Sequence, residues 1–255
     1  MSRLVDSPEL TVFNDLTEVI HAEGSAQFPN EACGLVIDIG GKGSVARPCR
    51  NVSREPQESF LLSPSDHRNA LKEGKIIGVW HTHPKTSSMP SPADLEACED
   101  SGVPWYIASV RKTPAGFTFS DVNTVVPSGF VMPYEGRPYL EGVFDCFGLL
   151  RDYYRREYGI SITNYPRVED DGTMGYTRFL ERYEKEGFVK MIDKKLEPGD
   201  VLLMQLFEHI VNHIAIYIGN NRILHHNRGR LSKQDIYGGY WQKCASVHLR
   251  HQSKC

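Results

Sequence analysis

The stretch that decides the fold of the first half of the chain is KIIGVWHTHP (residues 75–84), and SPAD (residues 91–94) follows shortly after it. Residues 75–80 are almost wholly apolar, which is typical of a short central strand that is buried on both faces. The histidine-containing segment begins where we expect this strand to end. Because His81 and His83 are two residues apart, an extended backbone places both imidazoles on the same side.

These residues have the make-up of a catalytic zinc site. Zinc takes nitrogen and oxygen ligands tetrahedrally, and a catalytic site keeps one position for water, whose pKa the metal lowers to about 7. Ser91 is a favourable N-cap for a helix that would present Asp94 as a third ligand beside the two histidines. Glu31, which precedes the first expected strand, is the candidate proton acceptor, and Ser91 is a candidate donor to an oxyanion. The alternative is that His81 and His83 are ordinary polar residues at the end of a strand.

The surrounding segments predict an α/β layered domain over residues 1–122. Helical spacing of apolar residues predicts a first helix, and the GGKG segment is a hairpin signal between two strands. In chain order the expected elements are helix 9–24, strand 32–39, strand 44–49, helix 63–71, strand 75–80, helix 92–98, strand 105–110 and strand 117–122.

The composition is that of an ordinary soluble globular protein. Of the 255 residues, 40% are hydrophobic and 24% are charged, and the net charge is −3 with a pI near 6.4. We find no dense run of lysine and arginine, so a nucleic-acid partner is not expected. The amino terminus lacks the apolar core of a signal peptide, and no apolar run is long enough to cross a bilayer. We therefore expect synthesis in a cytosol, where thiols stay reduced, and no insertion into a membrane.

A change of composition separates the second half of the chain. Prolines and glycines are concentrated in residues 123–136, and we expect a linker there. Residues 137–255 predict a domain in which helices are followed by an antiparallel sheet, an α+β pattern. The expected elements are helix 145–158, helix 177–187 and strands 201–206, 213–218, 222–226 and 245–250.

Cys146 is the candidate nucleophile of this second half. It begins an expected helix, whose dipole stabilises a thiolate and lowers its pKa. His213 and His225 lie on consecutive strands joined by a tight turn, so antiparallel pairing would bring them together on one face. His213 would then accept the thiol proton and His225 would orient it, as in a Cys-His-His triad, whereas His226 would point to the opposite face. Alternatively, Cys146 is a buried small hydrophobic residue, the usual role of a free cysteine.

The first half resembles the JAMM or MPN+ metallopeptidases, over roughly residues 9–122. The pattern of that family is a glutamate, then His-x-His, seven residues and Ser-x-x-Asp. It is matched here by Glu31, His81-Thr-His83 and Ser91-Pro-Ala-Asp94. The resemblance implies one zinc ion held by the two histidines and Asp94, with Glu31 as general base and Ser91 as a donor to the transition state. It also implies hydrolysis of a peptide or isopeptide bond.

The second half resembles the NlpC/P60 papain-like cysteine peptidases, over roughly residues 134–255. The supporting segments are GRPY (136–139), DCFGL (145–149), PGD (198–200) and HIAIYIG (213–219), together with His225. The resemblance implies a papain-like α+β fold, Cys146 as nucleophile, His213 as base, and Tyr139 as a residue that lines the site and assists the oxyanion. It also implies cleavage of peptidoglycan stem peptides, typically between D-γ-glutamate and diaminopimelate.

One position departs from the NlpC/P60 pattern. Phe147 stands where that family typically has a serine after the cysteine, and the spacing from Tyr139 to Cys146 is short. In the family, the serine and the preceding aspartate help to hold the free amine of a stem peptide. The preference of this chain for the end group of its substrate is therefore open.

The fusion of the two domains, without a signal peptide, resembles the tail-tip assembly protein K family of lambda-like siphophages. This resemblance implies synthesis in the host cytoplasm, phage tail-tip proteins as partners and a place in the tail tip of the virion. It also implies host peptidoglycan as a substrate when phage DNA enters the cell. Two other interpretations stay open: a structural tail component or assembly chaperone with idle peptidase sites, and a free cytosolic peptidase of cell-wall recycling.

Overall fold

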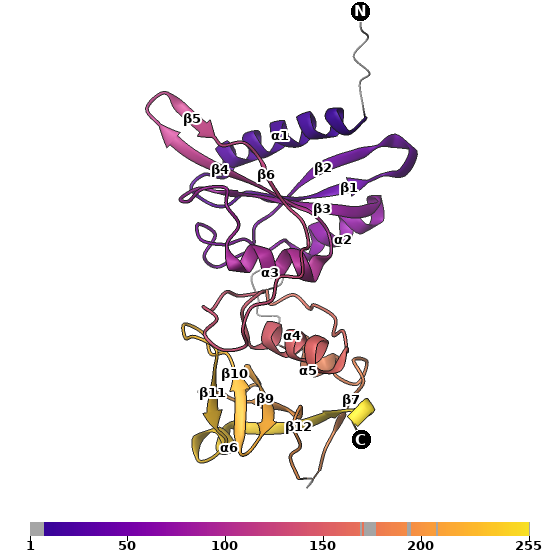
Figure 1. The fold of residues 1–255 in the computed structure, drawn as a ribbon, viewed down its shortest axis with the longest axis vertical. Helices are drawn as coiled ribbons and strands as arrows, with labels where there is room; N and C mark the ends of the chain where they lie inside the picture. The colour runs from indigo at the N-terminus through magenta and orange to yellow at the C-terminus, as the bar shows by residue number, and fades with distance from the viewer. Residues whose placement is uncertain (1–7, 169, 171–176, 193–194, 208, 255) are drawn as a thin grey trace, which may run out of the picture. The chain divides into compact units, whose positions relative to one another are not determined.

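A computed structural model describes residues 8–168, 170, 177–192, 195–207 and 209–254 (Figure 1). The chain divides into two compact units. The first comprises Met1–Val131 with Glu169–Gly172, and the second comprises Met132–Val168 with Thr173–Cys255. Each unit is described by itself below.

The first unit is a mixed sheet with helices on both faces. Its elements are α1 (Pro8–Gln27), β1 (Cys33–Asp38), the 3-10 turn η1 (Gly40–Lys42), β2 (Ser44–Cys49), α2 (Pro64–Glu73), β3 (Lys75–His83), α3 (Pro92–Ser101), β4 (Trp105–Thr113), β5 (Gly116–Phe119) and β6 (Asn123–Val125). The strand order is β2-β1-β3-β4-β5, and β6 pairs with β4. Strands β3 and β4 run parallel, and the other neighbours run antiparallel. Helix α1 lies over one face of this sheet, and α2 and α3 lie on the other (Figure 1).

Alternate residues of the central strands fill two separate cores. Val36 of β1 and Trp80 of β3 pack with Ile20 of α1 in one core. Their neighbours Leu35 and Val79 belong to the other core, which includes Cys98 of α3. Successive side chains of a strand point to opposite faces, so β3 must be apolar on both. This confirms the interpretation of residues 75–80 as part of a buried central strand.

Strand β3 is longer than the sequence predicts. We expected its end at Trp80, but it continues through His83. The extension is paired on both sides, because His81 is in register with Cys33 of β1 and with Ile107 of β4. Thr82 accepts a hydrogen bond at its Oγ1 from the N–H of Ala32, at 2.9 Å. His81 and His83 are therefore part of strand β3 and do not lie in a loop after it.

Gly34 lies in β1 where the sheet leaves no room for a side chain. A Cβ there would lie 2.2 Å from the carbonyl oxygen of Arg47 and 2.4 Å from the indole ring of Trp80. Because the Arg47 backbone cannot move without disturbing β2, we expect Gly34→Ala to lower the free energy of unfolding of the first unit by about 3 kcal/mol. Chemical denaturation measures this change. Gly41→Ala is the control, since a Cβ at Gly41 meets nothing within 4 Å; equal stability of the two variants would contradict the prediction.

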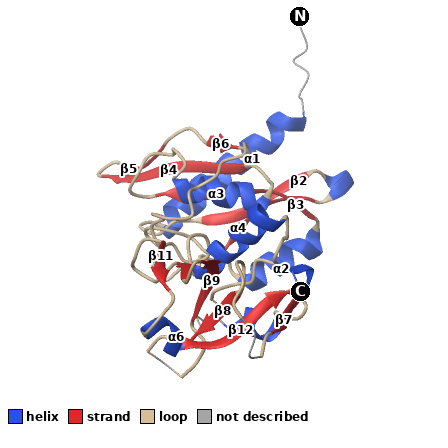
Figure 2. Cartoon of the chain, turned by 60° about the horizontal axis from the view of Figure 1, so that its bottom comes forward, coloured by secondary structure: helices blue, strands red, loops and turns tan. Residues whose placement is uncertain are grey.

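The second unit is a set of helices packed on an antiparallel sheet. Its elements are α4 (Cys146–Tyr158), α5 (Thr177–Arg182), β7 (Phe188–Lys190), β8 (Val201–Met204), β9 (His213–Gly219), β10 (Arg222–His225), β11 (Lys233–Ile236), α6 (Tyr240–Cys244), β12 (Ala245–His251) and the 3-10 turn η2 (Gln252–Lys254). The strand order is β11-β10-β9-β8-β12-β7, and every neighbouring pair is antiparallel. These strands are drawn in red in Figure 2, with α4 in blue.

The core of the second unit joins α4 to the sheet. Phe147, Leu150 and Tyr154 recur at helical spacing on α4 and are buried. They belong to one apolar cluster with Leu203 of β8 and Ile214 of β9. This packing brings the N-terminal turn of α4, where Cys146 lies, against the start of β9.

Some predicted elements differ from those observed. Residues 123–125, which the sequence assigns to the linker, form β6 because Val125 pairs with Trp105 of β4. The helix predicted over residues 177–187 ends at Arg182. Strands β7 and β11 were not predicted, because they have only three and four residues and their alternation is too short to recognise. Both are defined by their pairing with neighbouring strands.

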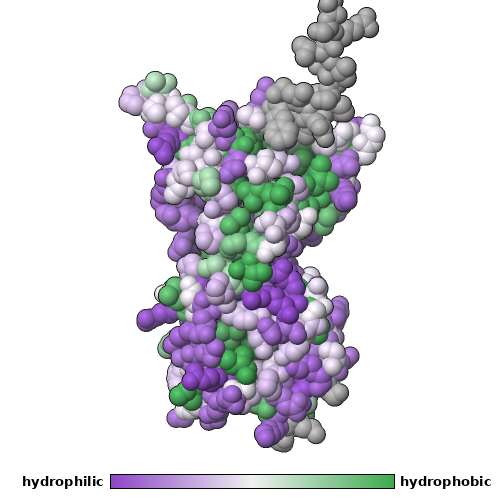
Figure 3. Space-filling view, viewed as in Figure 1, coloured by the Kyte–Doolittle hydropathy of each residue, from purple (hydrophilic) through white to green (hydrophobic). Residues whose placement is uncertain are grey.

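The surface has the mixed character that the composition predicts. On the face drawn in Figure 3, hydrophilic and apolar residues are interspersed over each unit. Within the part of the chain that the structure describes, no helix combines the length and the apolar character needed to cross a bilayer.

Candidate active sites

Three potential metal ligands come together between β3 and α3. Nε2 of His81 lies 3.0 Å from Nε2 of His83. The two carboxylate oxygens of Asp94 lie 3.4 Å from Nε2 of His81 and 3.5 Å from Nε2 of His83. All three residues are buried. The two-residue period of β3 puts both imidazoles on one face, and the first turn of α3 supplies Asp94 to that face.

This donor set fits a single zinc ion. Tetrahedral ligands about 2.0–2.1 Å from zinc are roughly 3.3 Å apart, and the separations of 3.0, 3.4 and 3.5 Å scatter around that value. His83 hydrogen-bonds through Nδ1 to the carbonyl oxygen of Ser87 at 2.7 Å, which leaves its Nε2 for a metal. Burial lowers the pKa of His81, which favours the neutral ring that a metal requires. Two imidazoles and a carboxylate suit zinc better than magnesium or calcium.

Ser91 fixes the orientation of Asp94. The Ser91 Oγ accepts from the N–H of Asp94 at 3.1 Å, and the N–H and Oγ of Ser91 donate to Asp94 Oδ2 at 2.7 and 2.8 Å. This is a complete capping box at the start of α3. Burial would raise the pKa of Asp94, but the neighbouring His81 and the hydrogen bonds from His83 and Ser91 outweigh it, so the pKa lies below its ordinary value. In this structure Ser91 therefore positions a ligand, and its role as an oxyanion donor stays a prediction.

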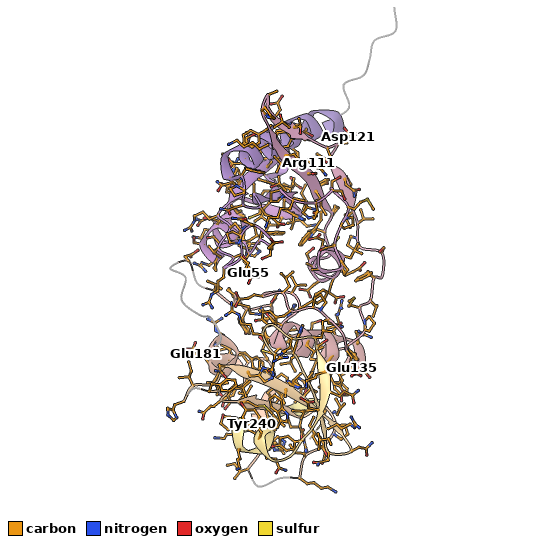
Figure 4. All side chains as sticks on the ribbon, turned by 90° about the vertical axis from the view of Figure 1, so that its left-hand side faces the viewer. Glu55, Arg111, Asp121, Glu135, Glu181 and Tyr240 are labelled. Atoms are coloured by element: carbon orange, nitrogen blue, oxygen red, sulfur yellow. The ribbon has the colours of Figure 1, made fainter. Side chains whose placement is uncertain are left out.

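Glu31 lies beside the ligand cluster. Its N–H donates to the carbonyl oxygen of Pro56 at 2.7 Å, next to Glu55, which Figure 4 labels. Its side chain is buried, and burial raises the pKa of its carboxyl group to about 8, with smaller electrostatic contributions from His83 and Asp94. Ala32, the next residue, exchanges hydrogen bonds with Thr82, which stands between the two histidines, so Glu31 enters the sheet beside them. A carboxyl group with a pKa near neutrality is suited to accept and release a proton there.

Cys146 and His213 line the same cavity in the second unit. Cys146 is the first residue of α4, and His213 is the first residue of β9. The backbone of Ile214, which follows His213, favours the thiolate form of Cys146 and so lowers its pKa slightly. On the next strand, Nδ1 of His225 lies 3.2 Å from Nε2 of His213. The residues of the expected Cys-His-His group are thus brought together by α4, β9 and β10.

Asp235 extends this group and is not among the residues that the sequence predicts for it. Its Oδ2 lies 3.1 Å from Nε2 of His225 and 2.9 Å from Nζ of Lys233. Asp235 reaches His225 only because β11 pairs with β10, and β11 was not predicted. The one available signal was an acidic residue in the segment KQDIY. Trp241 of α6, next to the labelled Tyr240 in Figure 4, packs edge-on against His225 at 4.4 Å between ring centroids.

The surroundings of Cys146 and His213 favour the neutral form of each side chain. Burial, followed by the charge of Asp145, raises the pKa of the Cys146 thiol to about 12. Burial, followed by the influence of His225 and His226, lowers the pKa of His213 to about 3. The predicted lowering of the cysteine pKa is therefore wrong, because burial and Asp145 outweigh the opposing influence of the Ile214 backbone, of Arg167 and of the Phe147 backbone at the start of α4.

Tyr139 lies beside His226. The two rings are 5.4 Å apart in an edge-to-face arrangement, and Nε2 of His226 lies 3.1 Å from the carbonyl oxygen of Arg230. Neither ring is among the described residues that line the cavity of Cys146. The role of Tyr139 at the oxyanion stays a prediction.

The protonation of His213 makes the stability of the second unit depend on pH. Its pKa is about 3 in the folded protein and 6.5 in an ordinary environment. Between these values the unfolded chain binds a proton that the folded site does not, so this contribution is complete above pH 6.5 and is lost as the pH falls towards 3. We expect a loss of roughly 3 kcal/mol at about pH 4. Urea denaturation at neutral and acidic pH measures it. His213→Gln should remove this part of the pH dependence, and equal dependence in both proteins would contradict the prediction.

The fold and the two sites define a protein with two peptidase-type domains. Residues 13–121 match the family model of prokaryotic homologs of the JAB domain, and residues 136–250 match the model of the NlpC/P60 family. The predicted fold class, an α/β JAMM/MPN-like domain followed by an α+β papain-like NlpC/P60 domain, is confirmed.

The comparison with individual proteins narrows this class. The chain is 35% identical, over 92% of its length, to the tail tip assembly protein K of Escherichia phage N15, of which 93% is covered. It is 30% identical, over 75% of its length, to the tail tip assembly protein K of Escherichia phage lambda, of which 90% is covered. A more distant relative is the bifunctional muramidase/DL-endopeptidase CwlT of Bacillus subtilis (strain 168), 28% identical over 44% of this chain and 31% of that protein. The chain belongs to the tail tip assembly protein K family, as predicted.

Proposed function

We propose that this chain is a component of the phage tail tip with two peptidase activities. The NlpC/P60 half would cut stem peptides of host peptidoglycan, of the D-γ-glutamyl-diaminopimelate type, as phage DNA enters the cell. The JAB-type half would be a zinc-dependent hydrolase of a peptide or isopeptide bond in a protein. The observation that carries the proposal is the cavity shared by Cys146 and His213, with His225 and Asp235 behind it. The names of the phage relatives support the tail tip, and that of CwlT supports a peptidoglycan peptide as substrate.

Asp235 determines which imidazole nitrogens carry protons. A carboxylate only accepts hydrogen bonds, so Nε2 of His225 carries the proton that points at Asp235. Nδ1 of the neutral His225 is then an acceptor, and Nε2 of His213 donates to it. This leaves Nδ1 of His213 unprotonated. His213 is thus held as the tautomer that can take a proton from a thiol.

The reaction at Cys146 follows from this arrangement. Nδ1 of His213 accepts the thiol proton as the sulfur attacks the peptide carbonyl carbon, and the imidazolium is stabilised through His225 by Asp235. His213 then gives the proton to the leaving amine, and a thioester remains on Cys146. His213 next takes a proton from water, whose oxygen attacks the thioester. The proton returns to the sulfur, and the products are a carboxylic acid and an amine.

In the JAB-type half, the residues of the chain have distinct roles. His81, His83 and Asp94 would hold zinc, which when bound supplies a Lewis acid and lowers the pKa of water. Ser91 keeps the carboxylate of Asp94 in place through the capping box. Glu31 would accept the proton released at this site and pass it to the leaving amine.

A second candidate function is a structural tail component with an idle thiol site. The observation that favours it is the resting state of Cys146, a partly buried thiol with a pKa of about 12 beside a buried histidine with a pKa of about 3. Such a pair reacts only if the substrate changes its surroundings.

A search for products by mass spectrometry separates these functions. Purified sacculi and purified tail proteins would each be incubated with the wild type, Cys146→Ala and Glu31→Gln. We expect stem-peptide fragments from sacculi with the wild type and Glu31→Gln, and none with Cys146→Ala. We expect protein fragments with the wild type and Cys146→Ala, and none with Glu31→Gln. Intact sacculi after treatment with the wild type would favour the idle site.

A further inference from the structure

A lysine lies directly opposite His225 on the neighbouring strand. In the register of β10 and β11, His225 pairs with Lys233, and Asp235 lies two residues further along β11. Side chains two residues apart on a strand point to the same face, and directly opposite residues of an antiparallel pair have Cβ atoms about 4.5–5.5 Å apart. The register therefore brings Lys233 and Asp235 together on the face of His225.

The lysine and the histidine contact the same carboxylate oxygen. Nε2 of His225 lies 3.1 Å from Oδ2 of Asp235, and Nζ of Lys233 lies 2.9 Å from that same atom. The side chain of Lys233 is 53% exposed, whereas that of His225 is fully buried. Nδ1 of His225 in turn lies 3.2 Å from Nε2 of His213. The positive charge thus stands at the solvent end of a series of contacts that leads to the candidate base.

The charge of Lys233 opposes the influence of Asp235 on His225. Burial lowers the pKa of His225, the hydrogen bond and the charge of Asp235 act to raise it, and the charge of Lys233 acts to lower it. Further groups that face His225 carry no fixed charge: the imidazole of His213 on β9, the amide of Asn227 and the indole of Trp241 on α6. The balance between one carboxylate and one ammonium group therefore sets how strongly this side of the site stabilises an imidazolium.

We propose that Lys233 restrains the reactivity of Cys146 by competing for the charge of Asp235. The inference rests on the proposed function, in which His213 takes the thiol proton and becomes an imidazolium. Lys233 is not among the described residues that line the cavity, so it acts as a positioning residue, through Asp235 and His225. Without the lysine charge, Asp235 stabilises the imidazolium more strongly, and the proton passes more readily from the sulfur to Nδ1 of His213.

The test measures the alkylation of Cys146 by iodoacetamide in the full chain, and peptide mapping by mass spectrometry separates this thiol from the others. Iodoacetamide is uncharged, so the loss of a lysine charge does not change its concentration near the site. We expect Lys233→Gln to raise the rate at neutral pH about two- to fivefold, the size of effect that an exposed ion pair has. The acidic limb of the rate against pH should also move to higher pH, which a merely structural defect would not cause. An unchanged rate with an unmoved limb would overturn the inference.

Two further variants isolate the route through Asp235. Lys190→Gln is the matched control, because Lys190 is an exposed lysine on β7, at the opposite edge of the same sheet from β11; it should keep the wild-type rate. Asp235→Asn should lower the rate by about tenfold or more, since it removes the charge that stabilises the imidazolium. Lys233→Gln added to Asp235→Asn should then have no further effect. A rise as large as in the single variant would refute the route through Asp235.

Salt gives an independent measurement on the unaltered protein. The contact between Lys233 and Asp235 is open to solvent and is screened by salt, whereas the contact with the buried His225 is screened much less. Raising sodium chloride from about 0.05 M to about 1 M should therefore increase the wild-type alkylation rate towards that of Lys233→Gln and change the variant little. An equal response of the two proteins would contradict the proposal.

Digestion of sacculi is a separate readout. It tests the proposed function, whereas alkylation tests the influence of Lys233 on the thiol and needs no peptidase substrate. Digestion by the wild type without any effect of Lys233→Gln on alkylation would leave the proposed function standing and overturn the inference. The expected alkylation rates without digestion would support the role of Lys233 and contradict the peptidase activity.

Discussion

Cys146→Ala is expected to lower the release of peptides from sacculi by at least about 1000-fold. The reason is geometric as well as chemical: the sulfur lies at the start of α4, in the cavity that also holds His213. Alanine removes the nucleophile and leaves the helix N-cap, Asp145, unchanged. The measurement is the rate at which soluble muropeptides appear, quantified by chromatography and mass spectrometry.

The control for this change is another free thiol of the same unit. Cys244, in α6, is half-buried and does not line the cavity. Cys244→Ala should digest sacculi at close to the wild-type rate. If Cys146→Ala digested sacculi as fast as Cys244→Ala, the proposed cysteine peptidase activity would be contradicted.

His83→Ala is expected to abolish stoichiometric zinc binding. It removes one of three ligands, and the loss of affinity should exceed the 10- to 100-fold that is typical for a residue that only supports a ligand, so we expect more than about 100-fold. After gel filtration in metal-free buffer, elemental analysis should find one zinc per chain in the wild type and almost none in the variant. Added zinc should raise the Tm of the first unit only in the wild type, because a ligand stabilises the state that binds it.

The control for His83→Ala is the substitution of an exposed histidine in the same unit. His67 lies on α2, is exposed, and is not one of the candidate ligands. His67→Ala should keep its zinc and its thermal response. Zinc retained at one equivalent by His83→Ala would show that the ligand set is different from the one proposed.

The candidate zinc ligands could be found from the sequence because their arrangement is local. A two-residue spacing on an extended segment is enough to put His81 and His83 on one face, and the helix signal at Ser91 is enough to bring Asp94 into a first turn. The extent of β3 could not be found in this way. Its last residues are held by pairing with β1 and β4, which depends on segments far away in the chain.

In the thiol site, too, the features set by neighbouring residues in the sequence could be predicted, and those set by tertiary packing could not. The helix at Cys146 and the hairpin that carries His213 and His225 are local features, and both were predicted. Asp235 was not predicted, because it reaches His225 through tertiary packing. The pKa of Cys146 was predicted in the wrong direction for a related reason: a sequence shows the helix dipole, but it does not show how deeply the thiol is buried.

The hydrogen bonds between Thr82 and Ala32 have a consequence for the dimensions of the candidate zinc site. Thr82 stands between the two histidines, and Ala32 follows Glu31. The N–H of Ala32 donates to Thr82 Oγ1 and the N–H of Thr82 donates to the carbonyl oxygen of Ala32, each at 2.9 Å, so the segment of the proposed base is tied to the segment of the proposed ligands. The spacing between Glu31 and the two histidines is therefore set by the pairing of β1 with β3, and the segment after β3 adds the carbonyl oxygen of Ser87, which holds Nδ1 of His83. The proposed base and two of the three proposed ligands thus keep their separation as a property of the sheet.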